Sequence, residues 1–263
     1  MFNRHFDPFN LLVHQKSGTL FVLNPKVMTS FTRRLVNEGI KDLGSEAGLS
    51  CDRFPWLKQA RSFPLQPISF YFRLAFNQEN LSVFTLVRNP YTRLFSAWKD
   101  KFYDPHKKGG GEEAFYPRSM RNSELKDFRL FAKKSGLEGA KNQTLVPFST
   151  FLARIEAQKE GRRNHHWDTQ FTVLQAHHFK FTGIFKYETE REECFDTIFG
   201  RMGFDKQWIR KKLAYRVNST TSDDTKLISI DDLERVSSIF KRDFDFFGYE
   251  KSIPNALVKY LKD

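Results

Sequence analysis

The residues with the clearest chemical potential lie in one segment near the middle of the chain, VRNPYTRLFSAW (87–98). Arg88 follows an apolar run typical of a buried strand, and Ser96 lies about one turn into the helical pattern that comes next. Ligands of open α/β sheets bind at such strand-to-helix corners, where an arginine and a serine hydroxyl can bind a phosphate. The spacing fits a second interpretation equally well, in which Arg88 pairs with a carboxylate and Ser96 faces solvent.

An earlier segment, NPKVMTS (24–30), has the features of another anion-binding loop. It joins an apolar run to a helical pattern, and the start of a helix presents backbone N–H groups and a partial positive charge. Lys26 adds a full charge, and Thr29 and Ser30 add hydroxyl groups. The segment lacks the glycines of a Walker A loop. Taken alone, Lys26 also fits an ordinary exposed loop lysine.

The two segments together narrow the choice of ligand. An enzyme that uses ATP needs a carboxylate for Mg²⁺ near the end of a neighbouring strand. The strand that ends at Val87 is followed instead by Arg88, which favours a metal-free site for a second phosphate. Few ligands carry phosphates at two separated points of one nucleoside, and 3′-phosphoadenosine 5′-phosphosulfate is one of them.

The elements that must position these groups alternate between apolar runs and amphipathic stretches. Such alternation predicts an α/β fold with a central parallel sheet flanked by helices on both faces, in a single domain over residues 1–263. Residues 44–67 and 104–123 are predicted loops, and the second is long enough for a lid. Residues 68–76 fit either a strand or a helix. We expect strands at 19–23, 81–87 and 179–185. Helices are expected at 29–36, 93–103 and 125–134, and two more are expected to begin at the N-cap residues Ser149 and Thr189. A last helix is expected from 231 to 246, before Gly248.

Composition indicates an anionic partner and a reducing compartment. Lys and Arg number 43 against 31 Asp and Glu, giving a net charge of +12 in 263 residues. Two cysteines, Cys51 and Cys194, are too few for a disulfide framework and lack metal-ligand spacing. The first residues contain no secretory apolar region, and no apolar run approaches the roughly 20 residues needed to cross a bilayer. We therefore expect a cytoplasmic protein without a membrane span.

Several motifs, in order along the chain, resemble the carbohydrate sulfotransferases, above all the type that sulfates chondroitin and related glycans. The order extends from about residue 19 to 250. The matching segments are a 5′-phosphosulfate loop from Pro25 to Ser30, a 3′-phosphate motif from Arg88 to Phe102, the pair His166-Trp167, the strand 181–188, a basic loop at 216–220, and the terminal signature Asp243-Phe244 with Phe247-Gly248-Tyr249.

The resemblance implies a P-loop-like three-layer sulfotransferase fold, with 3′-phosphoadenosine 5′-phosphosulfate as the co-substrate and no metal. Lys26 would neutralise the leaving oxygen, and Arg88 with Ser96 would bind the 3′-phosphate. His166 is the first candidate for the general base and His165 the second; a packed structural histidine is the alternative. The implied donor-binding residues are Lys26, Val27, Met28, Thr29, Ser30, Phe31, Arg88, Ser96, Arg216 and Asn218.

The chain also departs from the family pattern. Met28 stands where the family has a small residue, and Asn89 where Asp is more frequent. Luminal relatives carry two cysteines after the His-Trp pair, at positions that correspond here to Leu174 and His177. The loss of that pair suits a reducing cytosol and favours a soluble relative of bacterial type.

The acceptor implied is a carbohydrate or glycoconjugate, and the basic surface favours an acidic one. A lipid-linked sugar or a small metabolite fits almost as well. Two rival functions remain open, a nucleotide or small-molecule kinase and a non-catalytic module that binds polyanions. The basic residues are spread along the chain rather than gathered in one stripe, which argues against nucleic acid as the partner.

Overall fold

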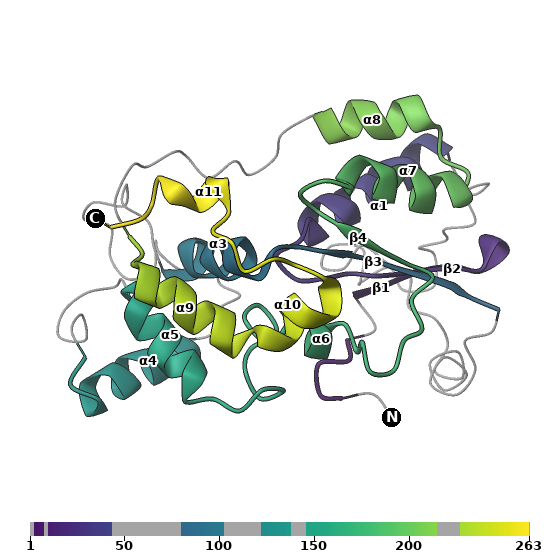
Figure 1. Ribbon diagram of the computed structural model, residues 1–263. Helices are drawn as coiled ribbons and strands as arrows, with labels where there is room; N and C mark the ends of the chain where they lie inside the picture. The colour runs from purple at the N-terminus through teal and green to yellow at the C-terminus, as the bar shows by residue number, and fades with distance from the viewer. Residues whose placement is uncertain are drawn as a thin grey trace. The chain divides into compact units, whose positions relative to one another are not determined.

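The computed structural model describes residues 3–7, 10–43, 80–102, 122–137, 146–214 and 227–262 (Figure 1). The chain divides into two compact units, and each unit is made of two separate segments. Unit 1 comprises Met1–Asn89 and Gln170–Thr221, and unit 2 comprises Pro90–Thr169 and Ser222–Asp263.

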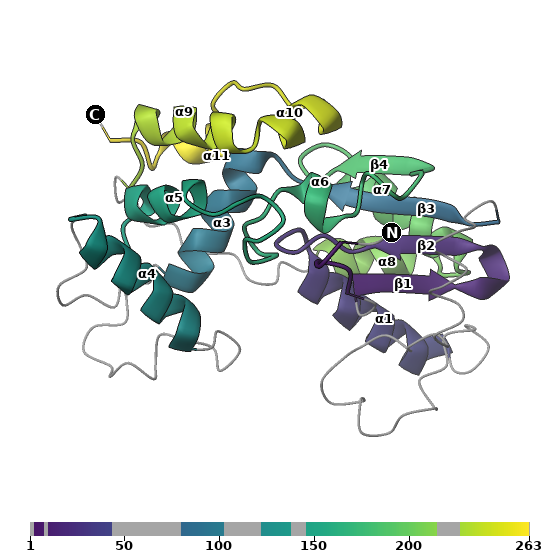
Figure 2. The same cartoon turned by 90° about the horizontal axis from the view of Figure 1, so that it is seen from below.

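Unit 1 contains a four-stranded sheet in the order β1-β2-β3-β4 (Figure 2). Strand β3 runs parallel to both β2 and β4, so the predicted parallel sheet is confirmed for these three strands. Strand β1 is antiparallel to β2, which makes the sheet mixed rather than wholly parallel. The strands are β1 (Leu11–His14), β2 (Thr19–Val22), β3 (Ser82–Val87) and β4 (Gly183–Lys186).

The edge strand β1, which we did not predict, exists because the chain reverses tightly before β2. Gly18 adopts φ +62°, a left-handed conformation that glycine adopts without strain. A Cβ at this position would lie 2.8 Å from the carbonyl oxygen of Asn80, so the turn also requires the absence of a side chain. The β1–β2 connection is therefore a hairpin rather than a crossover.

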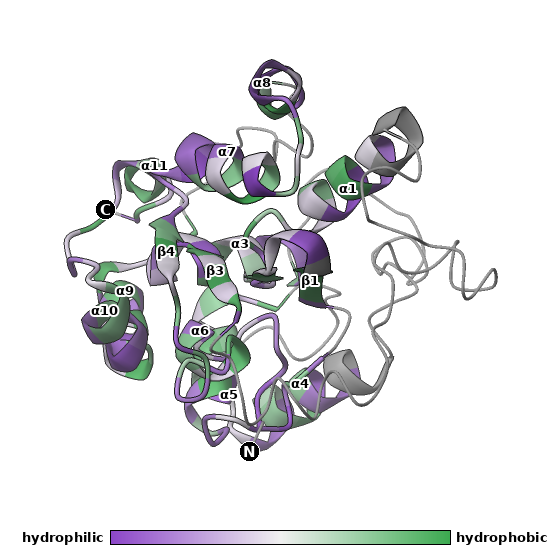
Figure 3. Ribbon diagram, turned by 90° about the vertical axis from the view of Figure 1, so that its right-hand side faces the viewer, coloured by the Kyte–Doolittle hydropathy of each residue, from purple (hydrophilic) through white to green (hydrophobic). Residues whose placement is uncertain are grey.

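The long helices of unit 1 cover one side of this sheet. Figures 1 and 3 show α1, α7 and α8 together on that side, and the single turn α6 on the other. The predicted helix 29–36 is confirmed and is longer than expected. The expected N-cap at Thr189 is wrong, because the residue that precedes α7 is Glu190. The helices are α1 (Thr29–Leu43), α6 (Gln170–Val173), α7 (Arg191–Arg201) and α8 (Lys206–Ala214).

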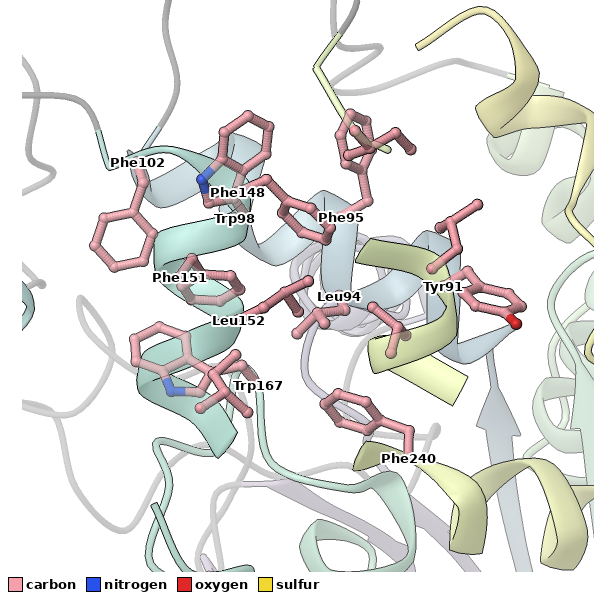
Figure 4. Close-up of a cluster of buried hydrophobic side chains, with 14 of the residues drawn as sticks. Tyr91, Leu94, Phe95, Trp98, Phe102, Phe148, Phe151, Leu152, Trp167 and Phe240 are labelled. Carbon is pink, nitrogen blue, oxygen red and sulfur yellow. The ribbon is translucent and has the colours of Figure 1, made fainter. Parts of the chain in front are cut away.

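Unit 2 is helical in its described part, and its core is rich in aromatic side chains. Figure 4 shows Phe95, Trp98 and Phe148 close together, with ring centroids 5.3–5.9 Å apart. The indole N–H of Trp98 donates to the carbonyl of Val146 at 2.7 Å. The helices are α3 (Pro90–Phe102), α4 (Asn122–Lys134), α5 (Phe148–Glu156), α9 (Ile230–Ile239), α10 (Lys241–Phe247) and α11 (Asn255–Val258).

Several predicted boundaries need correction. Pro147, not Ser149, precedes α5, and the expected helix 231–246 is two helices that meet at Phe240. A capping box at Ser229 starts the first of them, and Gly248 with φ +62° ends the second as predicted. The predicted strand 179–185 is shorter, over Gly183–Lys186. Residues 44–76 and 104–121 lie outside the described residues.

Candidate active site

Two strand-to-helix corners of unit 1 lie side by side at one edge of the sheet. Val22 of β2 pairs with Thr85 of β3, so both strands end at the same edge. The loop after β2 carries Lys26, and Arg88 follows β3 directly. The Nη1 of Arg88 lies 3.4 Å from the carbonyl oxygen of Lys26, a long contact that brings the two segments together.

The loop after β2 has an unusual backbone. Lys26 has φ +68° and Met28 has φ +56°, in the left-handed region that non-glycine residues rarely adopt. Each such residue costs on the order of 1–3 kcal/mol, and strain of this kind concentrates at functional sites. Alternating conformations of this type turn successive N–H groups to one side and form anion-binding loops. The loop therefore has two residues in a conformation that suits an anion-binding loop, although it lacks the Walker A glycines.

Asn24 closes the loop through its backbone carbonyl. That oxygen accepts the hydroxyl of Thr29 at 2.7 Å and the backbone N–H of Val27 at 3.0 Å. The hydroxyl proton of Thr29 is therefore used inside the loop, although the sequence suggested that it would face the ligand. Thr29 can still offer its backbone N–H to an anion.

The first turn of α1 supplies the N–H groups. The first hydrogen bond of the helix joins Thr32 N to Met28 O at 2.8 Å. The N–H groups of Thr29, Ser30 and Phe31 precede it and have no carbonyl partner within the helix. These groups carry the partial positive charge of the helix terminus, so the turn favours an anion.

The side chains around this turn differ in environment. Ser30 is exposed, whereas Val27 is buried in the core of unit 1. The ring of Phe31 packs edge-on against Phe195, with centroids 5.5 Å apart. The side chains of Val27 and Phe31 therefore pack into unit 1 and leave only their backbone available to a ligand of the loop.

Neighbouring residues contact both the backbone and the side chain of Arg88. The side-chain amide of Gln170 accepts from Arg88 N at 3.0 Å and donates to Arg88 O at 2.8 Å. The guanidinium lies over the ring of Tyr187, 5.2 Å from its centroid. The following residue, Asn89, donates its N–H to Glu188 Oε1 at 2.9 Å. Tyr187 and Glu188 follow β4, so three successive strand ends contribute to this corner.

The candidate bases lie in unit 2. The ring Nδ1 of His166 is 2.8 Å from Asn164 Oδ1, and the same oxygen accepts His166 N at 2.9 Å. Because Asn164 presents an oxygen, a neutral His166 carries its proton on Nδ1 and its lone pair on Nε2. That is the tautomer that a general base requires at Nε2. The exposed ring of His165 stacks against His166, with centroids 4.2 Å apart.

A buried polar cluster fixes the irregular segment that carries these histidines. Arg93 is 1% exposed and donates to the carbonyls of Asp168 and His165, at 2.8 and 3.1 Å. The carboxylate of Asp168 accepts the N–H of Gly161 at 2.8 Å. Burial lowers the pKa of the nearby Arg163 guanidinium, and the charge of Asp168 opposes that shift. The segment is positioned by side chains rather than by regular secondary structure.

The structure thus distributes the predicted residues over both units. Lys26 and Arg88 lie on adjacent segments of unit 1, and Val27 to Phe31 continue from Lys26 into the first turn of α1. His165 and His166 belong to unit 2, as does the half-buried Ser96 on α3. Arg216 and Asn218 lie outside the described residues.

Sequence reasoning missed the residues that support the site, namely Gln170, Arg93 and Asn164. A buried amide or guanidinium interrupts an apolar pattern without a periodicity of its own. The one signal for Arg93 was its place inside the 87–98 segment, and Asn164 precedes the two histidines. Nothing in the spacing marked Gln170.

The described part of the chain contains neither a candidate metal site nor a helix that could cross a membrane. No three His, Cys, Asp or Glu side chains come close enough there to hold a metal ion, including those of the 164–178 region. Within the same residues, every helix is too short or too polar to span a bilayer.

Comparisons with known proteins identify the family. Residues 57–250 match the model of the sulfotransferase family, and the chain belongs to that family. The match includes Arg88 and the histidine pair and begins after the Lys26 loop. Carbohydrate sulfotransferase 11 of Rattus norvegicus and of Mus musculus are each 27% identical over 179 residues, which cover 66% of this chain and 48% of the relative. The chain therefore spans about half the length of these curated relatives. No solved structure matches it.

Proposed function

We propose that this protein transfers a sulfuryl group from 3′-phosphoadenosine 5′-phosphosulfate to a hydroxyl of a carbohydrate or glycoconjugate. The observation that carries the proposal is the contact between the Lys26 loop and Arg88 at neighbouring strand ends. Two cationic groups on adjacent corners suit a nucleotide with phosphates at two separate points. Membership of the sulfotransferase family supports the same reaction.

Most of the residues that bind the donor in this proposal belong to unit 1. The N–H groups of Thr29, Ser30 and Phe31 hold the 5′-phosphate, with the backbone of Val27 and Met28 shaping the loop. The ammonium of Lys26 neutralises the charge that grows on the bridging oxygen as the S–O bond breaks. Arg88 and Ser96 bind the 3′-phosphate, which distinguishes this donor from ATP. Arg216 and Asn218 complete the donor site.

The general base in this proposal is His166. Nε2 of His166 takes the proton of the acceptor hydroxyl as that oxygen attacks sulfur, in line with the leaving phosphate oxygen. The products are a sulfate ester and adenosine 3′,5′-bisphosphate, and the proton remains on the imidazole until solvent removes it. His165 is the second candidate for this role.

The acceptor and setting are also part of the proposal. The matched relatives are named carbohydrate sulfotransferases, and the net charge of +12 favours an acidic glycan. The three-layer, P-loop-like arrangement and a single sulfotransferase domain over residues 1–263 stay predictions. So does a cytoplasmic location, which rests on the low cysteine content.

Calorimetric titration tests the donor site. We expect wild-type protein to bind adenosine 3′,5′-bisphosphate at least about tenfold more tightly than ATP, and Arg88→Ala to remove most of that preference, because one charged hydrogen-bonding group contributes about 1.5–3 kcal/mol. Arg201→Ala is the control, since Arg201 lies near Phe84 and bonds Ser82 at the opposite end of β3. A preference for ATP with Mg²⁺, or no nucleotide binding, would contradict the proposal and favour a kinase or a polyanion-binding module.

A second experiment separates binding of the donor nucleotide from transfer of the sulfuryl group. Lys26→Ala should abolish sulfate transfer to a panel of glycans while the bisphosphate still binds, because the lysine acts on charge that appears only as the bond breaks. Lys16→Ala, at an exposed lysine before Gly18, removes the same charge elsewhere in unit 1. Normal turnover in the Lys26 variant would exclude this role.

A further inference from the structure

Gln170 occupies an unusual position at the candidate donor site. It is the first residue of α6, a single turn that lies near the carboxyl end of β3 (Figure 2). Gln170 is completely buried. Its amide makes two hydrogen bonds with the backbone of Arg88 and accepts a third from Asn24 Nδ2 at 2.6 Å. One side chain thus joins the loop after β2 to the residue after β3.

The two hydrogen bonds from Gln170 to Arg88 take the place of bonds that a longer strand β2 would make with this residue. β2 pairs with β3 only as far as Thr85, and the chain then leaves the sheet as the Lys26 loop. Arg88 lies beyond this pairing, where its N–H and carbonyl would lack a partner from β2. Gln170 satisfies both groups, as a buried backbone requires. The residue that carries the guanidinium is therefore fixed by a side chain from a distant part of the sequence.

The orientation of each amide follows from its partners. Arg88 N can only donate and Arg88 O can only accept, so Oε1 of Gln170 faces the first and Nε2 the second. Oε1 then needs a donor from Asn24, which turns Nδ2 towards it and also donates to Leu86 O at 3.3 Å. Asn24 is 1% exposed, and its carbonyl holds the hydroxyl of Thr29. A continuous series of hydrogen bonds therefore runs from Arg88 to the first turn of α1.

We propose that Gln170 is a positioning residue that sets the spacing between the two phosphate-binding corners. The inference rests on the proposed function. A ligand with both a 3′- and a 5′-phosphate depends on that spacing, whereas a ligand with the 5′-phosphate alone needs only the Lys26 loop. Gln170 therefore determines the preference for a nucleotide that carries both groups.

The test compares Gln170→Met with Gln175→Met. Gln175 is a buried glutamine of the same unit. Its Oε1 accepts the backbone N–H of Asn3 at 2.8 Å, and its Nε2 donates to the side chain of Asn3. Calorimetry measures the affinity for adenosine 3′,5′-bisphosphate and for adenosine 5′-phosphate. We expect Gln170→Met to lower the ratio of the two affinities by on the order of tenfold or more, since small displacements of binding groups have effects of this size. Gln175→Met should keep the wild-type ratio.

A double-mutant cycle distinguishes positioning from general destabilisation. If Gln170 acts through Arg88, its substitution should change bisphosphate affinity little in an Arg88→Ala background. Equal effects in both backgrounds, or a folded Gln170→Met protein with the wild-type ratio, would overturn the inference. If wild-type protein shows no preference for the bisphosphate, the proposed function fails instead.

A second variant covers the case in which Gln170→Met does not fold. Asn24→Ala keeps the amide of Gln170 on Arg88 and keeps the carbonyl that closes the loop, but it breaks the connection between the two corners. We expect it to lower the same affinity ratio several-fold. An unchanged ratio in folded Asn24→Ala protein would contradict the role of this connection.

Discussion

The two units hold their candidate functional groups by different means. In unit 1, Lys26 and Arg88 lie where parallel strands end, and the sheet itself brings them to one edge. In unit 2, His165 and His166 lie in an irregular segment, which buried polar side chains and an aromatic core hold in place. The first arrangement is built on backbone topology and completed by one buried side chain, Gln170, whereas the second depends on side chains throughout.

This difference predicts how each site responds to mutation. Substitutions at the corners of unit 1 should change binding while the sheet persists, because backbone pairing holds the strands that lead to the corners. Substitutions in the histidine segment should change catalysis or stability through single contacts. The variants below separate these two responses.

The largest effect is expected for His166→Ala. Loss of a general base should lower the turnover rate by on the order of 10²- to 10⁴-fold. Affinity for adenosine 3′,5′-bisphosphate should stay unchanged, because His166 is not among the proposed donor-binding residues. Steady-state rates and calorimetry on the same protein measure the two quantities.

His165→Ala is the matched control, since it removes the neighbouring exposed ring, whose centroid lies 4.2 Å from that of His166. It should keep most of the activity. The reverse outcome, with His165→Ala inactive and His166→Ala active, would move the base to His165.

The comparison also shows how much of the site can be predicted from sequence. Lys26 and Arg88 could be placed because a strand followed by a helix fixes where the chain turns, and apolar runs reveal buried parallel strands. The same signals predicted β2, β3 and α1 within a few residues at their starts. They missed β1, whose four residues form a hairpin that depends on Gly18 and on contact with Asn80.

The histidine segment could not be predicted from the residues alone. No periodic pattern covers 164–169, and His166 was selected only because the His-Trp pair resembles a family motif. The hydrogen bonds of Arg93 to His165 and of Gln170 to Arg88 join residues that are at least 72 positions apart in the sequence. Such contacts arise from tertiary packing, so a local pattern does not contain them.

Arg93→Met tests whether side chains hold the histidine segment. It removes a buried guanidinium that serves two carbonyls and should lower the free energy of unfolding by about 3 kcal/mol, the upper range for charged hydrogen bonds. Denaturant unfolding measures the change. Arg154→Met is the control, because the ion pair of Arg154 with Asp127 is partly exposed and such pairs contribute about 0–1 kcal/mol. Equal losses in the two variants would show that Arg93 has no special role.

The smallest and most specific effect is expected for Asn164→Asp. The new carboxylate would still accept the Nδ1 proton of His166, so the geometry at 2.8 Å can persist. A negative charge there stabilises the imidazolium, which cannot act as a base. The acidic limb of the pH–rate profile should therefore move to higher pH by about one unit, while the maximal rate at alkaline pH is retained. Asn255→Asp adds the same charge at an exposed position of unit 2 and should leave the profile unchanged. A profile that moves to lower pH in Asn164→Asp, or moves equally in both variants, would mean that Asn164 does not set the protonation state of the base.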